Sequence, residues 1–289
     1  MPYDGISRIV LTIFELKCQK GDKIKNNTSH FCDVFAAHVK IEKYLLRNTS
    51  IKFFTMSGKI KLAIFDFDDT LKECKNTPLT LLFGLTKLFQ DEDLAKDFAT
   101  KVENNLISWP ERWDIFNENS KGTKEEVLDI LENRDELILD MEKVLNKLSQ
   151  DHDIVMISHN NRAVIDPFLK KHKIFDFFKD IFAQPSWISE SGKILHDPMP
   201  KEWSGYCGDE FSKCCKKSVL KVFLQNNPEY KEIIYFGDGA NDLCPALSLG
   251  PNDKVCPRKG FPLDLLLKSE AHNAKVLPWT SGADVLKFI

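Results

Sequence analysis

The stretch LAIFDFDDTL, residues 62–71, decides the fold of this chain. Its first four residues form an uninterrupted apolar run that stops at Asp66. A short apolar run that ends abruptly in a polar residue is typical of a strand buried on both faces of a parallel sheet. The run therefore predicts such a strand, with Asp66 at its carboxyl end.

Two later runs share this design. Residues 154–157 stop at Ser158, and residues 233–236 stop at Gly237 and Asp238. Strands that alternate with helices predict an α/β fold with a Rossmann-like, doubly wound parallel sheet. Such a sheet binds ligands at the carboxyl ends of its strands, so we expect Asp66, Ser158 and Asp238 to meet there. Helices are predicted between and around these runs, because apolar residues recur with helical spacing at 135–148, 163–172 and 213–225.

The rest of the sequence divides the chain into three parts. Residues 77–133 contain helical segments and no strand run, including 93–106 and a segment opened by the capping box Thr123 to Glu126. This insert predicts a small helical cap, which acts either as a lid over the site or as a structural excursion only. The core is then 56–76 together with 134–289, and residues 1–55 are an N-terminal extension to which the pattern assigns no fold.

The composition argues against nucleic acid and membranes as partners. Forty Lys plus Arg face 43 Asp plus Glu, for a formal net charge of −3, and the basic residues form no long cluster. No stretch approaches the roughly 18 apolar residues of a membrane helix, and the first residues do not match a secretion signal. The eight cysteines lack disulfide-framework and Cys-x-x-Cys spacing, which favours free thiols and makes zinc binding the minor alternative. We therefore expect a cytoplasmic protein.

The first chemical signal is a pair of acids two residues apart. In an extended chain the side chains of Asp66 and Asp68 point to the same side. Attack on a phosphate monoester needs a positioned nucleophile and a proton donor for the leaving oxygen. Asp66 is therefore the candidate nucleophile and Asp68 the candidate acid/base, with an aspartyl-phosphate as the intermediate.

Carboxylates facing a phosphate dianion repel one another, and a hard divalent cation with oxygen ligands removes that repulsion. Mg²⁺ is the expected cofactor. The candidate ligands are Asp66, the Asp68 carbonyl and Asp238, with Asp242 as a further ligand or as the residue that orients water or Asp238.

Two further elements would hold the phosphoryl group. Ser158 precedes Asn161 and a helix, so its hydroxyl and the following amides can bind a phosphoryl oxygen at a helix N-terminus. Asn161 is also a candidate substrate contact. Lys216 can neutralise the transferring group, and Lys217 competes for this assignment. Each motif alone also has a structural interpretation: a turn, a helix cap or a solvated charge. Their conjunction at strand and helix boundaries favours one phosphoryl-transfer site.

The motifs taken together resemble the haloacid dehalogenase superfamily of phosphatases, in the branch of the phosphoethanolamine/phosphocholine and pyridoxal-phosphate phosphatases. The resemblance spans roughly residues 56–289. It implies a Rossmann-like core with a small helical cap, Mg²⁺, and hydrolysis of small phosphorylated metabolites, with Asp66 as the nucleophile, Asp68 as the acid/base and Asp238 as a metal ligand. The stretches that carry it are LAIFDFDDTL, ISHNN, CKKSVL, IIYFGDGANDLCP, PRKGFPLDLL and VLPWTSGADVL.

The chain departs from this branch at two expected substrate contacts. The family's acids fall on Thr77 and His159 here. Carboxylates at those positions would attract a cationic head group, so their absence favours pyridoxal 5'-phosphate, or a similar neutral or anionic ester, over phosphocholine and phosphoethanolamine. The amino-alcohol phosphates stay as the alternative substrates. A slow phosphate-binding or receiver-like module is the alternative of another class, and phosphotransfer to a second acceptor is not separable from hydrolysis by sequence.

Overall fold

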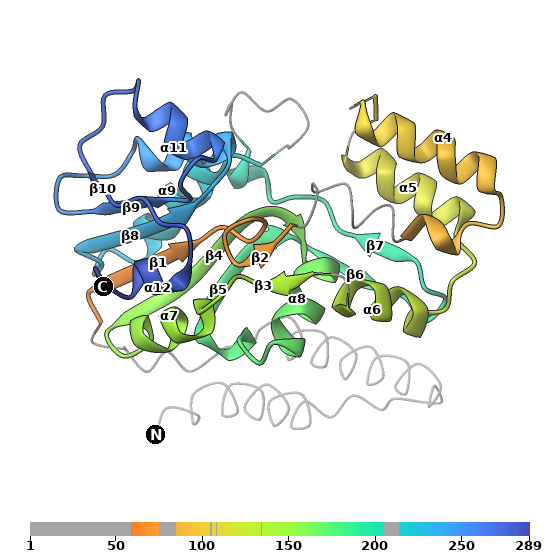
Figure 1. The fold of residues 1–289 in the computed structure, drawn as a ribbon, viewed down its shortest axis with the longest axis horizontal. Helices are drawn as coiled ribbons and strands as arrows, with labels where there is room; N and C mark the ends of the chain where they lie inside the picture. The colour runs from red at the N-terminus through yellow and green to blue at the C-terminus, as the bar shows by residue number, and fades with distance from the viewer. Residues whose placement is uncertain (1–58, 75–84, 105, 108, 134, 205–213) are drawn as a thin grey trace, which may run out of the picture. The chain divides into compact units, whose positions relative to one another are not determined.

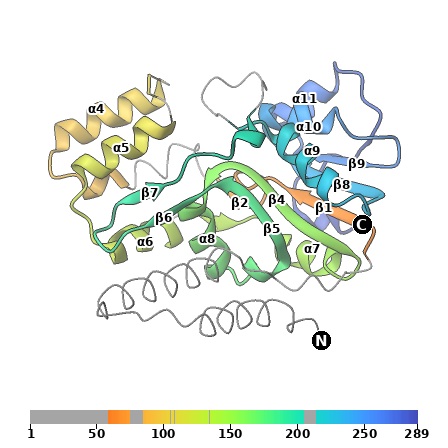
Figure 2. The ribbon, with the colours of Figure 1, turned by 180° about the vertical axis from the view of Figure 1, so that it is seen from behind.

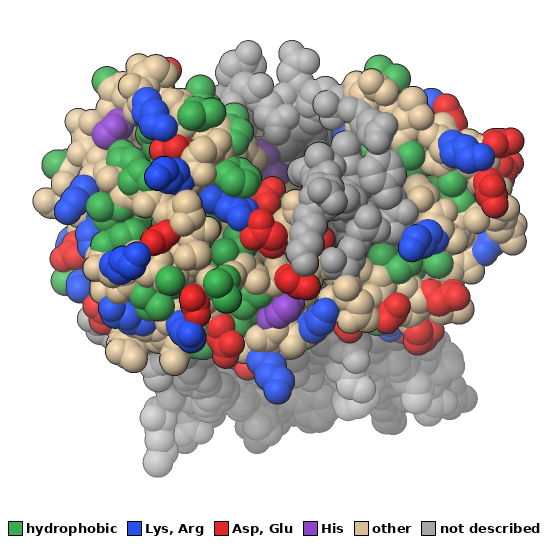
Figure 3. Space-filling model, in the orientation of Figure 1, with side chains coloured by type: hydrophobic (Ala, Val, Ile, Leu, Met, Phe, Trp, Pro, Cys, Tyr) green, Lys and Arg blue, Asp and Glu red, His purple; other side chains and the backbone are tan. Residues whose placement is uncertain are grey.

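The computed structural model describes residues 59–74, 85–104, 106–107, 109–133, 135–204 and 214–289. The predicted extension 1–55 and the candidate contact Thr77 lie outside these ranges. No helix in the described ranges is long and apolar enough to cross a membrane. Figure 3 shows Lys and Arg interspersed with Asp and Glu over the face that it displays.

A six-stranded sheet is the centre of the fold, with strand order β10-β9-β8-β1-β4-β5 (Figures 1 and 2). Every neighbouring pair is parallel. The three apolar runs lie in the three adjacent strands β1, β4 and β8, so the predicted doubly wound parallel sheet is confirmed. The strands are β1 (Lys61–Phe65), β4 (His152–Asn161), β5 (Phe178–Gln184), β8 (Glu232–Gly237), β9 (Lys254–Pro257) and β10 (Lys275–Val276).

Alternate side chains of β1 pack into two separate cores. Ala63 and Phe65 belong to the cluster that contains side chains of α7, α8 and α12, whereas Leu62 and Ile64 belong to the cluster with α9, α10 and α11. Both clusters are needed because successive residues of a strand point to opposite faces of the sheet. The helices are α7 (Met141–Leu148), α8 (Arg162–Lys171), α9 (Lys216–Asn226), α10 (Leu243–Ala246), α11 (Pro262–Leu267) and α12 (Gly282–Val285).

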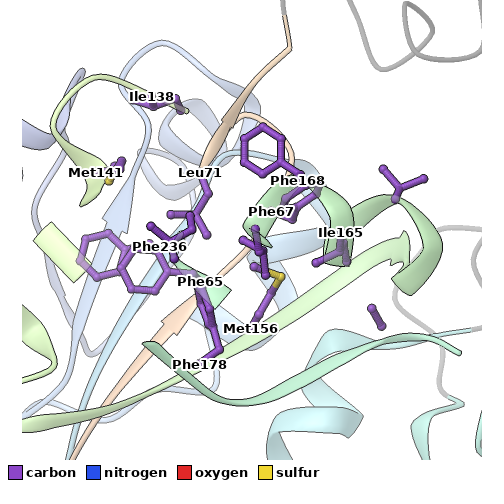
Figure 4. Packing of buried hydrophobic residues seen from close by; sticks show 14 of the residues in the cluster. Phe65, Phe67, Leu71, Ile138, Met141, Met156, Ile165, Phe168, Phe178 and Phe236 are labelled. Carbon is purple, nitrogen blue, oxygen red and sulfur yellow. The ribbon is translucent and has the colours of Figure 1, made fainter. Parts of the chain in front are cut away.

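Aromatic side chains brace the end of β1 that leads into the Asp66 stretch (Figure 4). The rings of Phe65 and Phe236 stack with centroids 4.3 Å apart. Phe67 meets Phe168 of α8 edge-on at 5.3 Å. Asp66 lies between Phe65 and Phe67 in the chain, so this rigid packing holds its backbone in one position.

The insert after β1 is helical, as predicted. It contains η1 (Thr86–Leu88), α4 (Glu92–Glu103), α5 (Trp109–Asn119) and α6 (Lys124–Asn133). The capping box at the start of α6 is formed: Thr123 N–H donates to Glu126 Oε2 at 2.8 Å, and Glu126 N–H donates to Thr123 Oγ1 at 3.2 Å. These reciprocal bonds satisfy two of the helix's free donors, which explains why it begins there.

Two short antiparallel ribbons tie the insert to the rest of the chain. β2 (Lys72–Glu73) pairs with β3 (Glu136–Leu137), so the two ends of the insert lie side by side. The helix predicted from residue 135 was wrong in its first part, because this pairing with distant residues replaces local helix formation. β6 (Ser186–Ile188) pairs with β7 (Ile194–His196), and Asn117 of α5 exchanges hydrogen bonds of 2.7 and 2.8 Å with the backbone of Ile194.

The described cysteines correct one expectation. Cys74, Cys214, Cys244 and Cys256 form no disulfide, but Cys215 is disulfide-bonded. The prediction of free thiols was wrong for Cys215, because linear spacing does not show which sulfur atoms the fold brings together.

Candidate active site

The ends of β1, β4 and β8 bring the predicted polar residues together. Phe65 pairs with Met156 on one side and with Phe236 on the other, so the residues that follow these strands leave the sheet at the same edge. Asp66 N–H continues the ladder by donating to Phe236 O at 2.9 Å. Asp66, Asp238 and Asp242 each offer a carboxylate oxygen, and these atoms lie within 4.8 Å of one another.

Lys216 is the cation of this cluster. Its side chain is fully buried, and its Nζ lies 2.8 Å from Asp66 Oδ2 and 2.7 Å from Asp242 Oδ1. Lys217, one residue later on α9, is exposed. Consecutive helical side chains differ by about 100° in direction, so only one of the two can face the sheet edge. The exposed side chain of Lys217 therefore points away from the acidic cluster, and Lys216 is the lysine that contacts it.

Asp242 organises the loop after β8. Its Oδ1 accepts from the Tyr235 hydroxyl at 2.6 Å, and its Oδ2 accepts from the backbone N–H groups of Asp238 at 3.1 Å and Gly239 at 3.0 Å. A Cβ at Gly237 would lie 2.6 Å from the Asp242 carboxylate, so this close approach requires glycine. Both oxygens of Asp242 are thus occupied by protein donors, an arrangement that favours orienting Asp238 over direct ligation.

Asp68 is held from two sides. Its Oδ1 lies 2.8 Å from Lys72 Nζ, and its Oδ2 accepts from Asn160 Nδ2 at 2.9 Å. Lys72 is itself buried and also pairs with Asp135 at 3.1 Å. Sequence reasoning missed the roles of Lys72, Asp135 and Asn160. The only signal was the spacing of Lys72 four residues after Asp68, which by itself means little on a loop.

The last residues of β4, from Ser158 to Asn161, have mixed surroundings. Ser158 is buried and its Oγ accepts from Asn160 N–H at 3.0 Å. Asn161 is the N-cap of α8, where its side chain accepts from Val164 N–H at 3.1 Å. His159 Nδ1 lies 3.1 Å from Asn241 Nδ2, which brings it beside the loop of Asp238. A capping carboxamide is committed to the helix, so Asn161 is the predicted substrate contact with the least freedom to bind a ligand.

Burial and mutual repulsion dominate the electrostatics of the acids. Burial, only partly offset by Lys216, raises the pKa of Asp66 to about 8. Burial, with repulsion from Asp66 and Asp242, raises the pKa of Asp238 to about 9. Burial also disfavours charge on Asp68, but the Lys72 ammonium and the Asn160 hydrogen bond outweigh it and lower the pKa of Asp68. At this edge of the sheet the pKa values of neighbouring carboxyls are thus shifted in opposite directions, a pattern common at catalytic sites.

The donor set fits a hard divalent cation. Carboxylate oxygens of Asp66 and Asp238 lie on adjacent strand ends, and oxygen is the ligand atom that Mg²⁺ prefers. Mutual repulsion adds to burial in raising the pKa values of Asp66 and Asp238, and carboxylates that repel one another gain from a positive charge among them. In the described ranges no other group of three metal-binding side chains lies so close together.

Comparisons with known proteins agree on one family. A family model described as "Putative Phosphatase" matches residues 61–289. A phosphoethanolamine/phosphocholine phosphatase from Gallus gallus is 29% identical over 160 residues, which cover 52% of this chain and 59% of that protein. A pyridoxal phosphate phosphatase from Homo sapiens is 30% identical over 154 residues, which cover 50% of this chain and 63% of that protein. The chain thus spans less than two thirds of the length of these relatives.

A solved structure shows the same fold. A HAD family hydrolase from Salmonella enterica matches with a TM-score of 0.53 at 14% identity, over 80% of this chain and 70% of that one. At this identity the likeness concerns the fold alone. It agrees with the Rossmann-like sheet described above.

Proposed function

Because this chain belongs to the phosphatase family whose model it matches, within the haloacid dehalogenase superfamily, we propose that it hydrolyses small phosphate monoesters with Asp66 as the nucleophile. The observation that carries the proposal is the buried cluster in which Lys216 Nζ lies 2.8 Å from Asp66 Oδ2, with Asp238 and Asp242 beside it. A buried nucleophile, a fixed cation and further acids at a sheet edge are the parts that phosphoryl transfer requires.

The first step forms a bond between Asp66 and phosphorus. A carboxylate oxygen of Asp66 attacks the phosphorus atom, the ester P–O bond breaks, and the leaving oxygen takes a proton from Asp68. Lys72 lowers the pKa of Asp68 in the free protein, but an incoming phosphate dianion favours the protonated carboxyl by like-charge repulsion. Lys216 Nζ and Ser158 Oγ are the groups that would hold phosphoryl oxygens.

The second step regenerates the enzyme. Asp68, now a carboxylate, removes a proton from a water molecule. The water oxygen bonds to phosphorus, the bond to Asp66 breaks, and inorganic phosphate leaves with both Asp66 and Asp68 in their starting states. The hydrogen bonds that Asp68 receives from Lys72 and Asn160 keep its carboxyl in one place for both proton transfers.

Mg²⁺ would be held by Asp66, the Asp68 carbonyl and Asp238. When bound, it supplies positive charge that offsets the repulsion between these carboxylates and the phosphate dianion. We assign Asp242 the orienting role, because both of its oxygens already accept hydrogen bonds from protein groups.

We favour pyridoxal 5'-phosphate, or an ester of similar charge, over phosphocholine and phosphoethanolamine. His159, where the branch has an acid, contacts Asn241 at 3.1 Å beside the candidate metal loop. An imidazole there offers no fixed negative charge to an ammonium head group. The second acid position, Thr77, lies outside the described residues. A cytoplasmic location stays a prediction of the composition.

A substrate panel tests this function. The purified chain is assayed for phosphate release from pyridoxal 5'-phosphate, phosphocholine, phosphoethanolamine and phosphoserine, with Mg²⁺ and with chelator. We expect Mg²⁺-dependent release, fastest from pyridoxal 5'-phosphate. Faster turnover of phosphocholine would reverse the substrate order, and no release from any ester by folded protein would favour a phosphate-binding module.

The raised pKa values predict how pH and Mg²⁺ act on stability. Between the ordinary carboxyl pKa of 3.8 and the values of about 8 and about 9, folded Asp66 and Asp238 hold protons that the unfolded chain has released. The metal-free protein should therefore lose stability as the pH rises through this window. Mg²⁺ replaces those protons, so its stabilising effect should grow with pH.

Thermal melts at about pH 6 and about pH 8.5, with and without Mg²⁺, measure this effect. We expect the Mg²⁺-induced rise in Tm to be larger at the higher pH. Asp238→Asn should remove most of the rise, whereas Asp93→Asn, whose side chain is 95% exposed, should leave it intact. An equal rise at both pH values would contradict the prediction.

A further inference from the structure

Two late stretches have no part in the proposed chemistry. They are PRKGF, residues 257–261, and Pro278-Trp279. Arg258 connects both stretches to the loop that follows β1. The guanidinium of Arg258 stands 4.4 Å from the ring centroid of Phe261 and 6.0 Å from that of Trp279.

Arg258 reaches the loop that carries the candidate nucleophile. Its Nη1 donates to Asp69 O at 3.0 Å and to Asp69 Oδ1 at 3.2 Å, and its Nη2 donates to Glu73 Oε1 at 2.7 Å. Arg258 is buried, with 8% of its surface exposed. A planar guanidinium with several donors satisfied on one loop fixes both the position and the orientation of that loop.

Asp69 is a residue that needs such support. Its φ is +49°, in the left-handed region that non-glycine residues rarely adopt. It lies between Asp68, the candidate acid/base, and Thr70, whose hydroxyl donates to Asp238 Oδ1 at 3.3 Å. A change in the backbone at Asp69 would therefore move groups on both sides of the proposed reaction centre.

The segment of residues 257–263, which contains PRKGF, also holds the loop that carries Asp238. Arg258 N–H donates to Gly237 O at 2.9 Å, and Leu263 N–H donates to Asp238 O at 2.8 Å. One short segment thus bonds to the nucleophile loop through the side chain of Arg258 and to the Asp238 loop through its backbone.

Trp279 fixes this segment from behind. It is 1% exposed, and its indole N–H donates to Cys256 O at 2.8 Å. Lys259 N–H donates to Trp279 O at 2.8 Å, and Trp279 N–H donates to Pro257 O at 3.2 Å. These bonds hold the Trp279 ring in place beside the guanidinium of Arg258. Because the ring is buried, desolvation strengthens the cation–π contact.

We propose that Arg258 is a positioning residue: it holds the loop of residues 66–74 in register with the loop of residues 237–242, so that Asp66, Asp68 and Asp238 present their oxygens together. The catalytic part of this inference rests on the proposed phosphatase function. The positional part does not, since it concerns only the contacts between the two loops.

The experiment compares Arg258→Met, Arg258→Lys and the neighbouring control Lys259→Met, whose side chain is exposed. Hydrogen exchange measured by mass spectrometry reports on the loops without any need for activity. Arg258→Met should speed exchange in peptides covering 66–74 and 237–242, with exchange across 152–157 of the central sheet unchanged. Arg258→Lys keeps the charge but lacks the planar fork, so it should fall between wild type and Arg258→Met.

Steady-state kinetics with the most active ester then test the consequence. Arg258→Met should lower kcat by about 10- to 100-fold and change KM by less than about threefold, since a misplaced reacting group costs rate more than binding. Lys259→Met should match wild type in both assays. Unchanged exchange in the two loops, or faster exchange spread evenly over the whole sheet, would overturn the proposal. If the wild-type protein releases no phosphate, the proposed function fails, and the exchange measurement still decides the positioning role.

Discussion

Asp66→Asn should lower kcat for phosphate release by about 10⁴-fold or more. Asn keeps the size of the side chain and can still accept the bond that Phe67 N–H donates to Asp66 Oδ1 at 2.7 Å, but its amide is not nucleophilic enough to attack phosphorus. Because burial already disfavours charge on Asp66, and Lys216 keeps its contact with Asp242 at 2.7 Å, the variant should keep a Tm close to that of wild type. Parallel measurements of kcat and Tm check both halves of this prediction.

Asp68→Asn separates the two acids. With an ester whose leaving group needs no proton, such as p-nitrophenyl phosphate, this variant should still transfer phosphate to Asp66 and then hydrolyse the intermediate slowly. A burst of p-nitrophenolate of about one equivalent per enzyme is expected. Asp66→Asn should show no burst. A burst from Asp66→Asn, or turnover by Asp66→Asn close to that of wild type, would contradict the assignment of Asp66 as the nucleophile.

Lys216→Met should be the most damaging substitution for activity and stability together. The variant leaves the Asp66 and Asp242 carboxylates, which Lys216 contacts at 2.8 and 2.7 Å, without their cation in a buried site. Breaking a buried pair on one side costs about 3–5 kcal/mol, which for a domain of this size lowers Tm by roughly 6 to 20 °C. Loss of the charge that would face the phosphoryl group should lower kcat by about 10²- to 10³-fold.

Two further variants make this prediction specific. Lys217→Met changes the exposed neighbour on α9 and should match wild type in kcat and Tm. Lys216→Met combined with Asp242→Asn removes one of the unpaired charges, so it should regain part of the lost Tm without regaining activity. Equal loss of activity in Lys217→Met, or full stability in Lys216→Met, would mean that Lys216 is not the cation of the site.

The order of elements in the core follows from local patterns. Apolar runs at 62–65, 154–157 and 233–236 lie in β1, β4 and β8, since only strands covered on both faces favour continuous apolar residues. The convergence of Asp66 and Asp238 follows from the same pattern, because the carboxyl ends of parallel strands share one edge. The helices of the insert were also predictable from local patterns, including the capping box at Thr123 and Glu126.

Local patterns failed where a contact joins distant residues. Residues 135–137 have helical spacing, but residues 136–137 form β3 because β2 lies beside them in the folded chain. The support of Asp68 by Lys72 and Asn160 depends on two loops that meet only in the folded state. No periodicity in the sequence reports such meetings, because they depend on where whole elements pack.

The sequence by itself determined the sheet, the edge where the site lies, and the acids that gather there. Continuous apolar runs and the helices between them are local features, and a helical crossover makes successive strands parallel. The tertiary structure alone decided that Lys216, and not Lys217, enters the cluster, since that choice depends on how α9 is rotated against the sheet. It alone connected Arg258 to Asp69, across 189 positions of the chain. Such long-range contacts arise only when the core packs, so they belong to the fold and not to any local pattern.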